Sequence, residues 1–444
     1  MRAVRITLDA SLTVHHPGTL LPALKRMARW KSKAGLVRKV VRLWRWDPEA
    51  DTLTLPRGLW PLPEAMGPFE VTDHRLTLPE VRFPWQGPQL DQWQRKAATR
   101  LYHRQGVLLA PGGTGKTLMG MATIRWWRQP TLWITDTDGL LKQALDDAHR
   151  YFRLPESAYG TVRDGQAQPG THLTVGLRQS LDGIRSPSWY ERFGAVFVDE
   201  VDLAASNSYL RILSRMRAVR RAGCTATIER ADQLHPIVFA MLGRSVSEIT
   251  EDEAVAAGRF QRVVIEIVRT GRRYDWPGDY PTLQLERARD GDRNWLIGLN
   301  VAKDLRQGHN ALVLVHRIEH ARLMSRTLTA VGVRHRVVTG KVAPDKRDEY
   351  YLEARKGGGQ CLIATKLINR GVDIPVIDRV HLADSFRAAS TVRQQIYRAT
   401  RTAEDLGKTD AVVYDYWDEN PQFMSQAWAR LRMYRERRWK VWGL

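Results

Sequence analysis

Short apolar runs alternate with longer amphipathic segments along most of the chain. Apolar runs bounded by glycine or polar residues predict buried strands, and segments whose apolar residues recur every three or four positions predict helices. Alternating strands and helices are typical of α/β folds, in which helices cover both faces of a mostly parallel sheet. In the first such region the predicted strands are 106–110, 131–135, 172–176, 194–198 and 222–226, and the predicted helices are 116–128 and 138–150.

The same alternation begins again at Asp292. Here the predicted helices are 293–307, 317–330, 344–356 and 390–401, and the predicted strands are 311–315, 334–338, 361–364, 378–382 and 411–416. We therefore predict two α/β lobes, at residues 86–258 and 291–444, joined by a linker at 259–290. The tail from Gln426 predicts a basic helix that carries Trp428, Tyr434, Trp439 and Trp442.

The first 85 residues have a different pattern. Prolines between Pro56 and Pro88 interrupt any long helix or central strand, because proline lacks a backbone donor and blocks the helical turn before it. A chain of 444 residues is long enough for about three domains of ordinary size. We therefore predict a separate small α+β module at residues 1–85.

The formal net charge of +21 indicates a polyanionic partner, because clustered Lys and Arg gain affinity by displacing counterions from phosphate backbones. Residues 24–46 contain nine basic side chains and no acid. Arg38 and Arg42 are the candidate nucleic-acid contacts in this stretch. Three tryptophans lie between the basic residues, and they fit a base-stacking surface or a small hydrophobic core equally well.

The composition argues against two other classes of protein. With only Cys224 and Cys361, the chain cannot build a disulfide framework or a four-cysteine zinc site. No apolar run approaches the roughly 20 residues that a membrane-spanning helix needs, and the N-terminus lacks the apolar segment of a signal peptide. We expect a protein of the reducing cytoplasm, in a prokaryotic or phage-infected cell, associated with the nucleoid.

A glycine-rich loop follows the first predicted strand of the first lobe. Ala-Pro-Gly-Gly-Thr-Gly-Lys-Thr spans 110–117, between a buried strand and a helix. Backbone N–H groups at such a turn, together with the positive end of a helix dipole, favour the phosphates of a nucleotide. Gly113 and Gly115 would shape this loop, Lys116 would reach the β- and γ-phosphates of ATP, and Thr117 would bind Mg²⁺.

Two adjacent acids end another predicted strand, in Val-Asp-Glu-Val-Asp at 198–202. One carboxylate at a strand tip can hold a metal ion's hydration shell while its neighbour accepts a proton from an attacking water. We assign Asp199 to Mg²⁺ and Glu200 to the activation of water. A solvated turn would also explain an acid pair, but its place about 80 residues after the phosphate loop favours the catalytic interpretation.

Taken in order, these motifs resemble those of superfamily 2 helicases, most closely the UvsW-like and XPB-like DNA branch, over residues 88–420. Leu-Asp-Gln-Trp-Gln at 90–94 resembles the family's adenine-recognising element, which implies that role for Gln94. The segments 131–143 and 174–180 resemble motif Ia and a following phosphate-contacting strand end, which implies nucleic-acid contacts by Thr137 and Arg178.

The segment 223–230 resembles motif III, which couples the state of ATP to the DNA track. The resemblance implies this coupling role for the hydroxyls of Thr225 and Thr227. A weaker likeness links Thr52-Leu53-Thr54-Leu55-Pro56-Arg57-Gly58-Leu59 to the duplex-binding domain of UvsW-like proteins.

Further motifs lie in the second lobe. The segments 338–341 and 363–375 resemble motifs IVa and V, in which Thr339 and Thr365 would touch the nucleic-acid backbone, while Gly371 and Asp373 would face the nucleotide. Threonines in such loops could otherwise be simple helix caps.

Gln-Gln-Ile-Tyr-Arg-Ala-Thr-Arg at 394–401 resembles motif VI, which implies roles for Gln394, Arg398 and Arg401 at the nucleotide. Two arginines three positions apart lie on one face of a helix. An arginine supplied across a cleft offsets charge on the transferring phosphoryl group, an effect of about 10³ to 10⁵ in rate. A surface helix in an arginine-rich protein is the alternative.

Four positions depart from the family's usual residues. Asp202 stands where histidine is usual, Ile228 where proline is usual, and Tyr397 where glycine is usual. Ala110 replaces the first glycine of the strict phosphate-loop pattern. None of these changes removes a catalytic group, but Asp202 is expected to alter the bridge between the ATP site and motif III.

The resemblance implies two tandem RecA-like parallel-sheet lobes plus a small N-terminal α+β DNA-binding domain. It also implies an ATP- and Mg²⁺-dependent DNA helicase or translocase that acts on a single-stranded track, a duplex or a branched junction in replication, recombination or repair. A restriction-type translocase subunit, an RNA helicase and a non-catalytic DNA-binding protein with a degenerate ATP site are the open alternatives. Oligomeric state is not set by the sequence, and a monomer is compatible with it.

Overall fold

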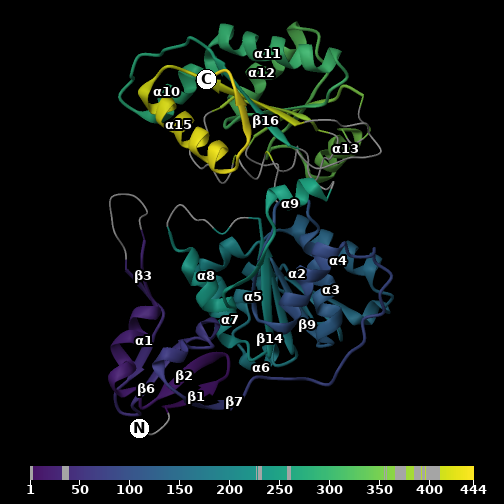
Figure 1. The fold of residues 1–444 in the computed structure, drawn as a ribbon. Coiled ribbons are helices and arrows are strands. Elements are labelled where there is room, and N and C mark those ends of the chain that lie inside the picture. Colours follow the sequence, from purple (N-terminus) through teal and green to yellow (C-terminus); the bar gives the residue numbers. More distant parts are fainter. Residues whose placement is uncertain are drawn as a thin grey trace. The chain divides into compact units, whose positions relative to one another are not determined.

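The computed structural model describes residues 4–32, 40–226, 228, 233–257, 262–354, 356, 358–365, 377–384, 392, 396 and 411–444. They belong to two compact units (Figure 1). The first comprises Met1–Pro111 and Gly115–Thr250, and the second comprises Glu251–Leu444 together with Gly112–Thr114.

A five-stranded sheet with the order β5-β6-β2-β1-β7 forms the N-terminal module. Its pairs are antiparallel except for β1 and β7, which run parallel. Alternate residues of the inner strands, such as Ile6, Leu12 and Leu53, are buried together with Leu24 of the helix α1. The elements are β1 (Val4–Leu8), β2 (Ser11–His15), α1 (Leu21–Met27), β3 (Arg29–Lys31), β4 (Val40–Arg42), β5 (Arg45–Asp47), β6 (Thr52–Pro56) and β7 (Phe69–Asp73), and β3 and β4 pair as a separate two-stranded ribbon.

The first α/β lobe is built on an eight-stranded sheet with the order β11-β10-β12-β9-β13-β14-β8-β15. Its pairs are parallel except for the β10–β11 hairpin. The strands are β8 (Gly106–Leu109), β9 (Thr131–Thr135), β10 (Tyr159–Arg163), β11 (Gln166–Gln168), β12 (Leu173–Leu177), β13 (Ala195–Asp199), β14 (Arg220–Thr225) and β15 (Ser245–Glu248). The predicted strands of this lobe are confirmed to within two residues, and the β10–β11 hairpin and β15 were not predicted.

Helices cover both faces of this sheet (Figure 1). One hydrophobic core joins the sheet to α2 (Gln92–His103), α3 (Lys116–Trp127) and α4 (Asp138–Tyr151). The core on the opposite face joins it to α5 (Arg178–Gly183), α6 (Pro187–Tyr190), α7 (Asn207–Arg215) and α8 (His235–Leu242). The inner strands therefore bury both of their faces, which explains why they appear in the sequence as continuous apolar runs.

The N-terminal module packs against this lobe. The 3₁₀ helix at Arg57–Leu59 approaches α8 so closely that a Cβ at Gly58 would lie 2.5 Å from the Ala240 carbonyl oxygen. Arg217 donates to the Asp9 carboxylate at 2.6 Å and to the His74 carbonyl at 2.8 Å. The module thus has its own sheet and core but shares one compact unit with the first lobe.

An extended segment at residues 74–90, which we call the strap, connects the module to α2. Backbone hydrogen bonds fasten it along the lobe: Leu76 N–H donates to Arg217, Val81 N–H to Arg128 and Gln86 N–H to Tyr151. This proline-rich stretch was expected only as a boundary between domains.

The second unit contains a seven-stranded sheet with the order β18-β19-β17-β20-β21-β16-β22, in which every described pair is parallel. Its strands are β16 (Val263–Arg269), β17 (Ala311–Leu314), β18 (Arg336–Val338), β19 (Cys361–Ala364), β20 (Arg379–Leu382), β21 (Ala411–Trp417) and β22 (Lys440–Trp442). One core joins the sheet to α9 (Glu251–Ala256), α13 (Pro344–Ala354) and α15 (Pro421–Glu436), and the other joins it to α11 (Gly291–Arg306) and α12 (Ile318–Ala330). The α/β class and the two parallel-sheet lobes are confirmed.

Two predictions for this unit are wrong. Residues 259–290 are not a linker, because β16 pairs with β21 over seven residues and α10 (Tyr280–Arg289) buries Leu283. The tail is not helical throughout, because Trp442 lies on β22, which pairs with β16. Most of the predicted helix at 390–401 lies outside the described residues. Within the described part of the chain, no helix is long and apolar enough to cross a membrane.

Candidate nucleotide site and strand-end residues

The glycine-rich loop leaves the end of β8, which lies between β14 and β15 in the sheet. Gly113 has φ +90° and Gly115 has φ +81°, a region that L-residues other than glycine seldom adopt. Ala110, which stands in place of the first glycine of the strict pattern, is buried, and its N–H donates to the Thr225 carbonyl at 3.0 Å. This position continues the strand pairing, so alanine is tolerated where the strict pattern has glycine.

Gln94 lies against this loop. A Cβ at Gly115 would lie 2.9 Å from Gln94 Nε2, so a side chain there would displace the end of the glutamine in addition to straining the positive φ of the loop. The position of Gln94 is set by a capping box at the start of α2, in which its Oε1 accepts from the Asp91 N–H at 3.0 Å. Its recognition of adenine stays a prediction.

The two predicted catalytic acids lie at the end of β13. Parallel pairing sets Asp199 opposite Cys224 on β14, whose thiol donates to Asp199 Oδ1 at 3.4 Å, and the Glu200 N–H donates to the same oxygen at 3.0 Å. The pKa of Asp199 is raised to about 6, chiefly by burial and also by the neighbouring Glu200 charge, while Lys116 acts in the opposite direction. Glu200 has φ +50°, an unfavourable backbone conformation for a residue with a side chain.

Thr225 links these acids to β14. Its buried hydroxyl lies within hydrogen-bonding distance of Glu200 Oε2 at 3.4 Å and of Asp202 Oδ1 at 3.2 Å. Asp202 therefore still contacts motif III, but as a carboxylate that accepts a hydrogen bond from the motif III threonine. The second coupling candidate, Thr227, lies outside the described residues, and Ile228 packs against the core beside α7 and α8.

The residues present fit Mg²⁺ and a nucleoside triphosphate. Mg²⁺ prefers oxygen ligands and is usually bound by one or two protein groups plus phosphates and water. Thr117 at the start of α3 and the buried Asp199 are oxygen donors of this kind, and Lys116 is close enough to Asp199 to lower its pKa. No cluster of three His, Cys, Asp or Glu side chains that could hold a metal ion occurs in the described part of the chain.

Two predicted nucleic-acid contacts in this lobe have structural partners. Thr137 is the N-cap of α4 and accepts from the Leu140 N–H at 3.3 Å. Arg178 donates to Asp136 and to Ser208, both at 2.6 Å. Both lie at the ends of the neighbouring strands β9 and β12, as predicted, but their contact with nucleic acid stays a prediction.

In the second unit, Thr339 and Thr365 follow the neighbouring strands β18 and β19. Both are buried, and the Thr365 N–H donates to the Val338 carbonyl at 3.3 Å. The Thr339 hydroxyl accepts from the Lys341 N–H at 3.4 Å, whereas the Thr365 hydroxyl has no partner among the described residues. The structure therefore brings the two threonines to one edge of the sheet.

Within the basic segment of the N-terminal module, Arg29–Lys31 and Val40–Arg42 form the ribbon β3–β4. Arg42 is exposed and lies directly opposite Arg29, so two like charges face each other across the strands. Its tryptophans are partly buried against the hydrophobic cores, and Lys25 lies over the rings of Trp44 and Trp46 at 4.6 and 5.1 Å. Packing therefore explains the tryptophans. The segment with likeness to a duplex-binding domain lies on β6 and on the 3₁₀ helix that packs against α8.

Several candidate residues lie outside the described part of the chain. They are Arg38 of the basic segment, and Gly371, Asp373, Gln394, Tyr397, Arg398 and Arg401 of the second unit. Their predicted roles at the nucleotide and the nucleic acid stay predictions.

Comparison with known families matches both halves of the chain. The family described as "Type III restriction enzyme, res subunit" matches residues 84–230, and "Helicase conserved C-terminal domain" matches residues 286–403. The first match contains the glycine-rich loop and both acids, and the second contains the strand ends with Thr339 and Thr365. The chain belongs to the superfamily 2 helicases.

Curated relatives of this superfamily 2 helicase include the DNA 3'-5' helicase XPB of Kineococcus radiotolerans, 23% identical over 78% of this chain and 62% of the relative. The putative DNA 3'-5' helicase Rad25 of Halobacterium salinarum is 23% identical over 72% of this chain and 51% of the relative. The chain thus spans between half and two thirds of the length of these relatives.

Solved structures support the fold of the superfamily 2 helicase. S. cerevisiae Dbp5 bound to RNA and ADP BeF3 superposes with a TM-score of 0.55 at 15% identity, covering 79% of this chain and 88% of that one. Tandem RecA-like lobes are therefore the architecture of residues from the strap onward.

Sequence reasoning missed the partners that hold the site. Asp136 and Ser208 hold Arg178, and Cys224 donates to Asp199. The capping box of Asp91 and Gln94 had a visible signal in the sequence, because an acid followed three positions later by glutamine before an apolar run is typical of a helix start. The other contacts join residues on separate strands and helices and leave no local pattern.

Proposed function

We propose that this protein is an ATP-dependent DNA helicase or translocase. The observation that carries the proposal is the meeting of three functions at neighbouring strand ends of one sheet. The glycine-rich loop follows β8, the acids Asp199 and Glu200 follow β13, and Thr225 on β14, between them, has a hydroxyl in reach of Glu200. A phosphate cradle, a metal ligand and a water-activating base are what phosphoryl transfer to water requires.

In this mechanism the backbone N–H groups of the loop hold the phosphates of ATP, and Lys116 offsets their charge. Mg²⁺, held by Thr117 and Asp199, would neutralise charge on the transferring phosphoryl group. Glu200 accepts a proton from the attacking water, and its carboxylate is oriented by the Thr225 hydroxyl. Arg398 and Arg401 are proposed to supply positive charge to the transition state from the second lobe.

DNA is the proposed track. The two relatives above are named as DNA 3'-5' helicases, and the net charge of +21 favours a polyanion. Strand-end residues such as Thr137 in the first lobe, and Thr339 and Thr365 in the second, are proposed to grip the DNA backbone. Alternating grip by two lobes that close on ATP and open after hydrolysis would move the protein along one strand. A role in repair, recombination or branch migration within the cytoplasm of a prokaryotic or phage-infected cell is part of this proposal.

The test is an ATPase panel with single strands, duplexes, forks and four-way junctions of DNA, and with RNA of matched sequence. We expect DNA to stimulate phosphate release, and Lys116→Ala and Glu200→Gln to abolish that stimulation. Lys142→Ala, an exposed lysine on α4, is the matched control and should behave as the unsubstituted protein. Full hydrolysis by Glu200→Gln would refute the base assignment, and stronger stimulation by RNA would refute the DNA assignment.

A further inference from the structure

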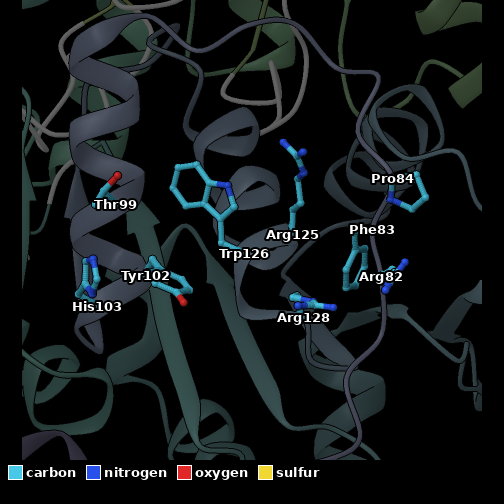
Figure 2. A pocket seen from close by; sticks show the side chains of 9 residues that line it. All are labelled: Arg82, Phe83, Pro84, Thr99, Tyr102, His103, Arg125, Trp126 and Arg128. Atoms are coloured by element: carbon cyan, nitrogen blue, oxygen red, sulfur yellow. The ribbon is translucent and has the colours of Figure 1, made fainter.

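A second cavity lies in the first lobe, away from the nucleotide site (Figure 2). It has a volume of about 750 Å³ and opens between the strap, the C-terminal half of α2 and the C-terminal end of α3. Trp126 in this cavity and Lys116 at the glycine-rich loop are ten residues apart on α3, or roughly 15 Å at 1.5 Å per residue. The cavity is therefore separate from the candidate ATP site in the same lobe.

The aromatic side chains of Phe83, Tyr102 and Trp126 line this cavity. Trp126 and Tyr102 lie edge to face, with ring centroids 6.3 Å apart and an interplanar angle of 86°. Phe83 of the strap is buried against Phe152, with ring centroids 5.0 Å apart. Trp126 and Tyr102 are only partly buried, so their rings offer surface to a planar ligand.

Basic side chains surround these rings. Arg82 on the strap and Arg125 and Arg128 at the end of α3 are exposed, and Figure 2 shows them beside Trp126 and Phe83. Arg128 pairs with Glu80 at 3.0 Å, but none of the described residues that line the cavity is acidic. Arg125 and Arg128 also suit the negative end of the α3 dipole. Arg82 lies on an extended segment, where no helix dipole explains it.

The cavity wall is fixed before any ligand binds. Backbone hydrogen bonds hold the strap on both sides of Arg82: the Val81 N–H donates to Arg128 at 3.0 Å, and the Pro84 carbonyl accepts from the Arg153 N–H at 3.2 Å. A ligand would therefore meet a backbone wall and aromatic rings already in place, from which the exposed arginine side chains extend, and this lowers the entropy lost on binding.

We propose that this cavity is an accessory binding site for one nucleotide unit of a single-stranded nucleic acid, distinct from the strand-end residues of the motor. A base would stack on the ring of Trp126 with its edge toward Tyr102, because the two rings are perpendicular, and the flanking phosphates would be held by Arg82 and Arg125. Base stacking beside basic side chains is the common mode of sequence-tolerant single-strand binding. An acidic peptide would satisfy the arginines but not the ring faces. This accessory site rests on the proposed function in one respect only, which is the choice of DNA as the strand that is bound.

The first experiment compares two double charge reversals in the full chain. Arg82→Glu with Arg125→Glu changes the cavity, and Arg163→Glu with Arg192→Glu changes the net charge equally at exposed positions elsewhere on the lobe. Fluorescence anisotropy of a labelled thymidine oligonucleotide, without ATP, measures affinity from 50 to 300 mM salt. We expect the cavity pair to weaken binding about tenfold more than the control pair and to lower the slope of log K against log salt by about 1.4, because each lost single-strand phosphate contact is worth about 0.7. Equal losses in the two pairs would overturn the proposal.

The second experiment locates the base. An oligonucleotide that carries 5-iododeoxyuridine is photo-crosslinked to the protein, and the adduct is mapped by mass spectrometry. We expect adducts on Trp126 or Tyr102, retained adduct yield and affinity in Trp126→Phe, and a fall in both in Trp126→Ala. Adducts only elsewhere, or equal competition by polyglutamate and polythymidine, would show an anion surface without base recognition and would overturn the site.

These results are independent of the motor. Failure of the proposed function would appear as phosphate release that DNA does not stimulate in the unsubstituted protein. The binding and crosslinking measurements contain no ATP, so they test the cavity even then.

Discussion

Replacing Asp199 by asparagine should make the protein more stable while it destroys the metal site. The folded protein holds this carboxyl group in a buried position that raises its pKa from 3.8 to about 6. Asn keeps the shape of the side chain and the oxygen that accepts from the Glu200 N–H. It removes the charge that burial and the neighbouring Glu200 disfavour.

The size of the effect follows from the pKa difference between the folded and unfolded states. A folded pKa above the unfolded value means that the ionised form is disfavoured in the fold, so the cost is largest above pH 6 and disappears below about pH 4. A shift of about two units corresponds to about 3 kcal/mol of free energy of unfolding at pH 7.5 and about half of that at pH 5. We therefore expect Asp199→Asn to raise the free energy of unfolding by up to these amounts.

Urea unfolding of the full chain at pH 7.5 and pH 5 measures this difference from the transition midpoints at constant slope. Asp182→Asn is a control of opposite sign, because a hydrogen bond from Arg211 lowers the pKa of Asp182 and its loss should cost stability, by about 1 kcal/mol or less at a surface pair. If Asp199→Asn were no more stable than the unsubstituted protein at pH 7.5, burial of the Asp199 charge would not be costly and our account of the site would be wrong.

Three further outcomes are expected. Thr225→Val should lower DNA stimulation of ATP hydrolysis by about ten- to a hundredfold, because a hydrogen bond to a charged group is worth about 1.5–3 kcal/mol. The ratio of ATPase rates with and without DNA measures this. An equal fall in Thr123→Val, which removes a buried hydroxyl bonded to backbone carbonyls, would show that the effect is merely structural. Affinity for Mg²⁺ and a fluorescent ATP analogue should fall about tenfold per unit below pH 6, because the metal requires ionised Asp199; a flat titration between pH 5 and 7 would contradict this. Arg29→Glu with Arg42→Glu should flatten the salt dependence of DNA binding by about one unit of slope per lost contact, and an unchanged slope would assign the ribbon to a solvated face.

Local patterns in the sequence were sufficient where one element carries the whole signal. The strand at 131–135 was predicted with the observed bounds, because a strand buried on both faces is a continuous apolar run. The glycine-rich loop and the acid pair were recognisable because each is a short motif at one strand end. The strand pairing then brings them together as predicted for parallel sheets.

Nonlocal contacts account for what the sequence did not predict. The run Val263–Arg269 was assigned to a linker by its place between the lobes, although its apolar residues suit a strand; its partner β21 is nearly 150 residues further along the chain. Arg178 was assigned to a phosphate, but Asp136 and Ser208, 42 and 30 residues away, approach it only after folding. The strap shows the same limit, because its prolines predict a break but not the lobe surface to which it is fastened.

The Thr225 hydroxyl has a single hydrogen and two carboxylates within reach, Glu200 and Asp202. In the proposed mechanism, both acceptors compete for that hydrogen while Glu200 is ionised, and Asp202 would be the stronger acceptor once Glu200 had taken a proton from water. Each catalytic cycle would then rotate this hydroxyl from one neighbour to the other. The aspartate at 202 would thereby make the direction of this hydroxyl at the end of β14 depend on whether the water has already given up its proton.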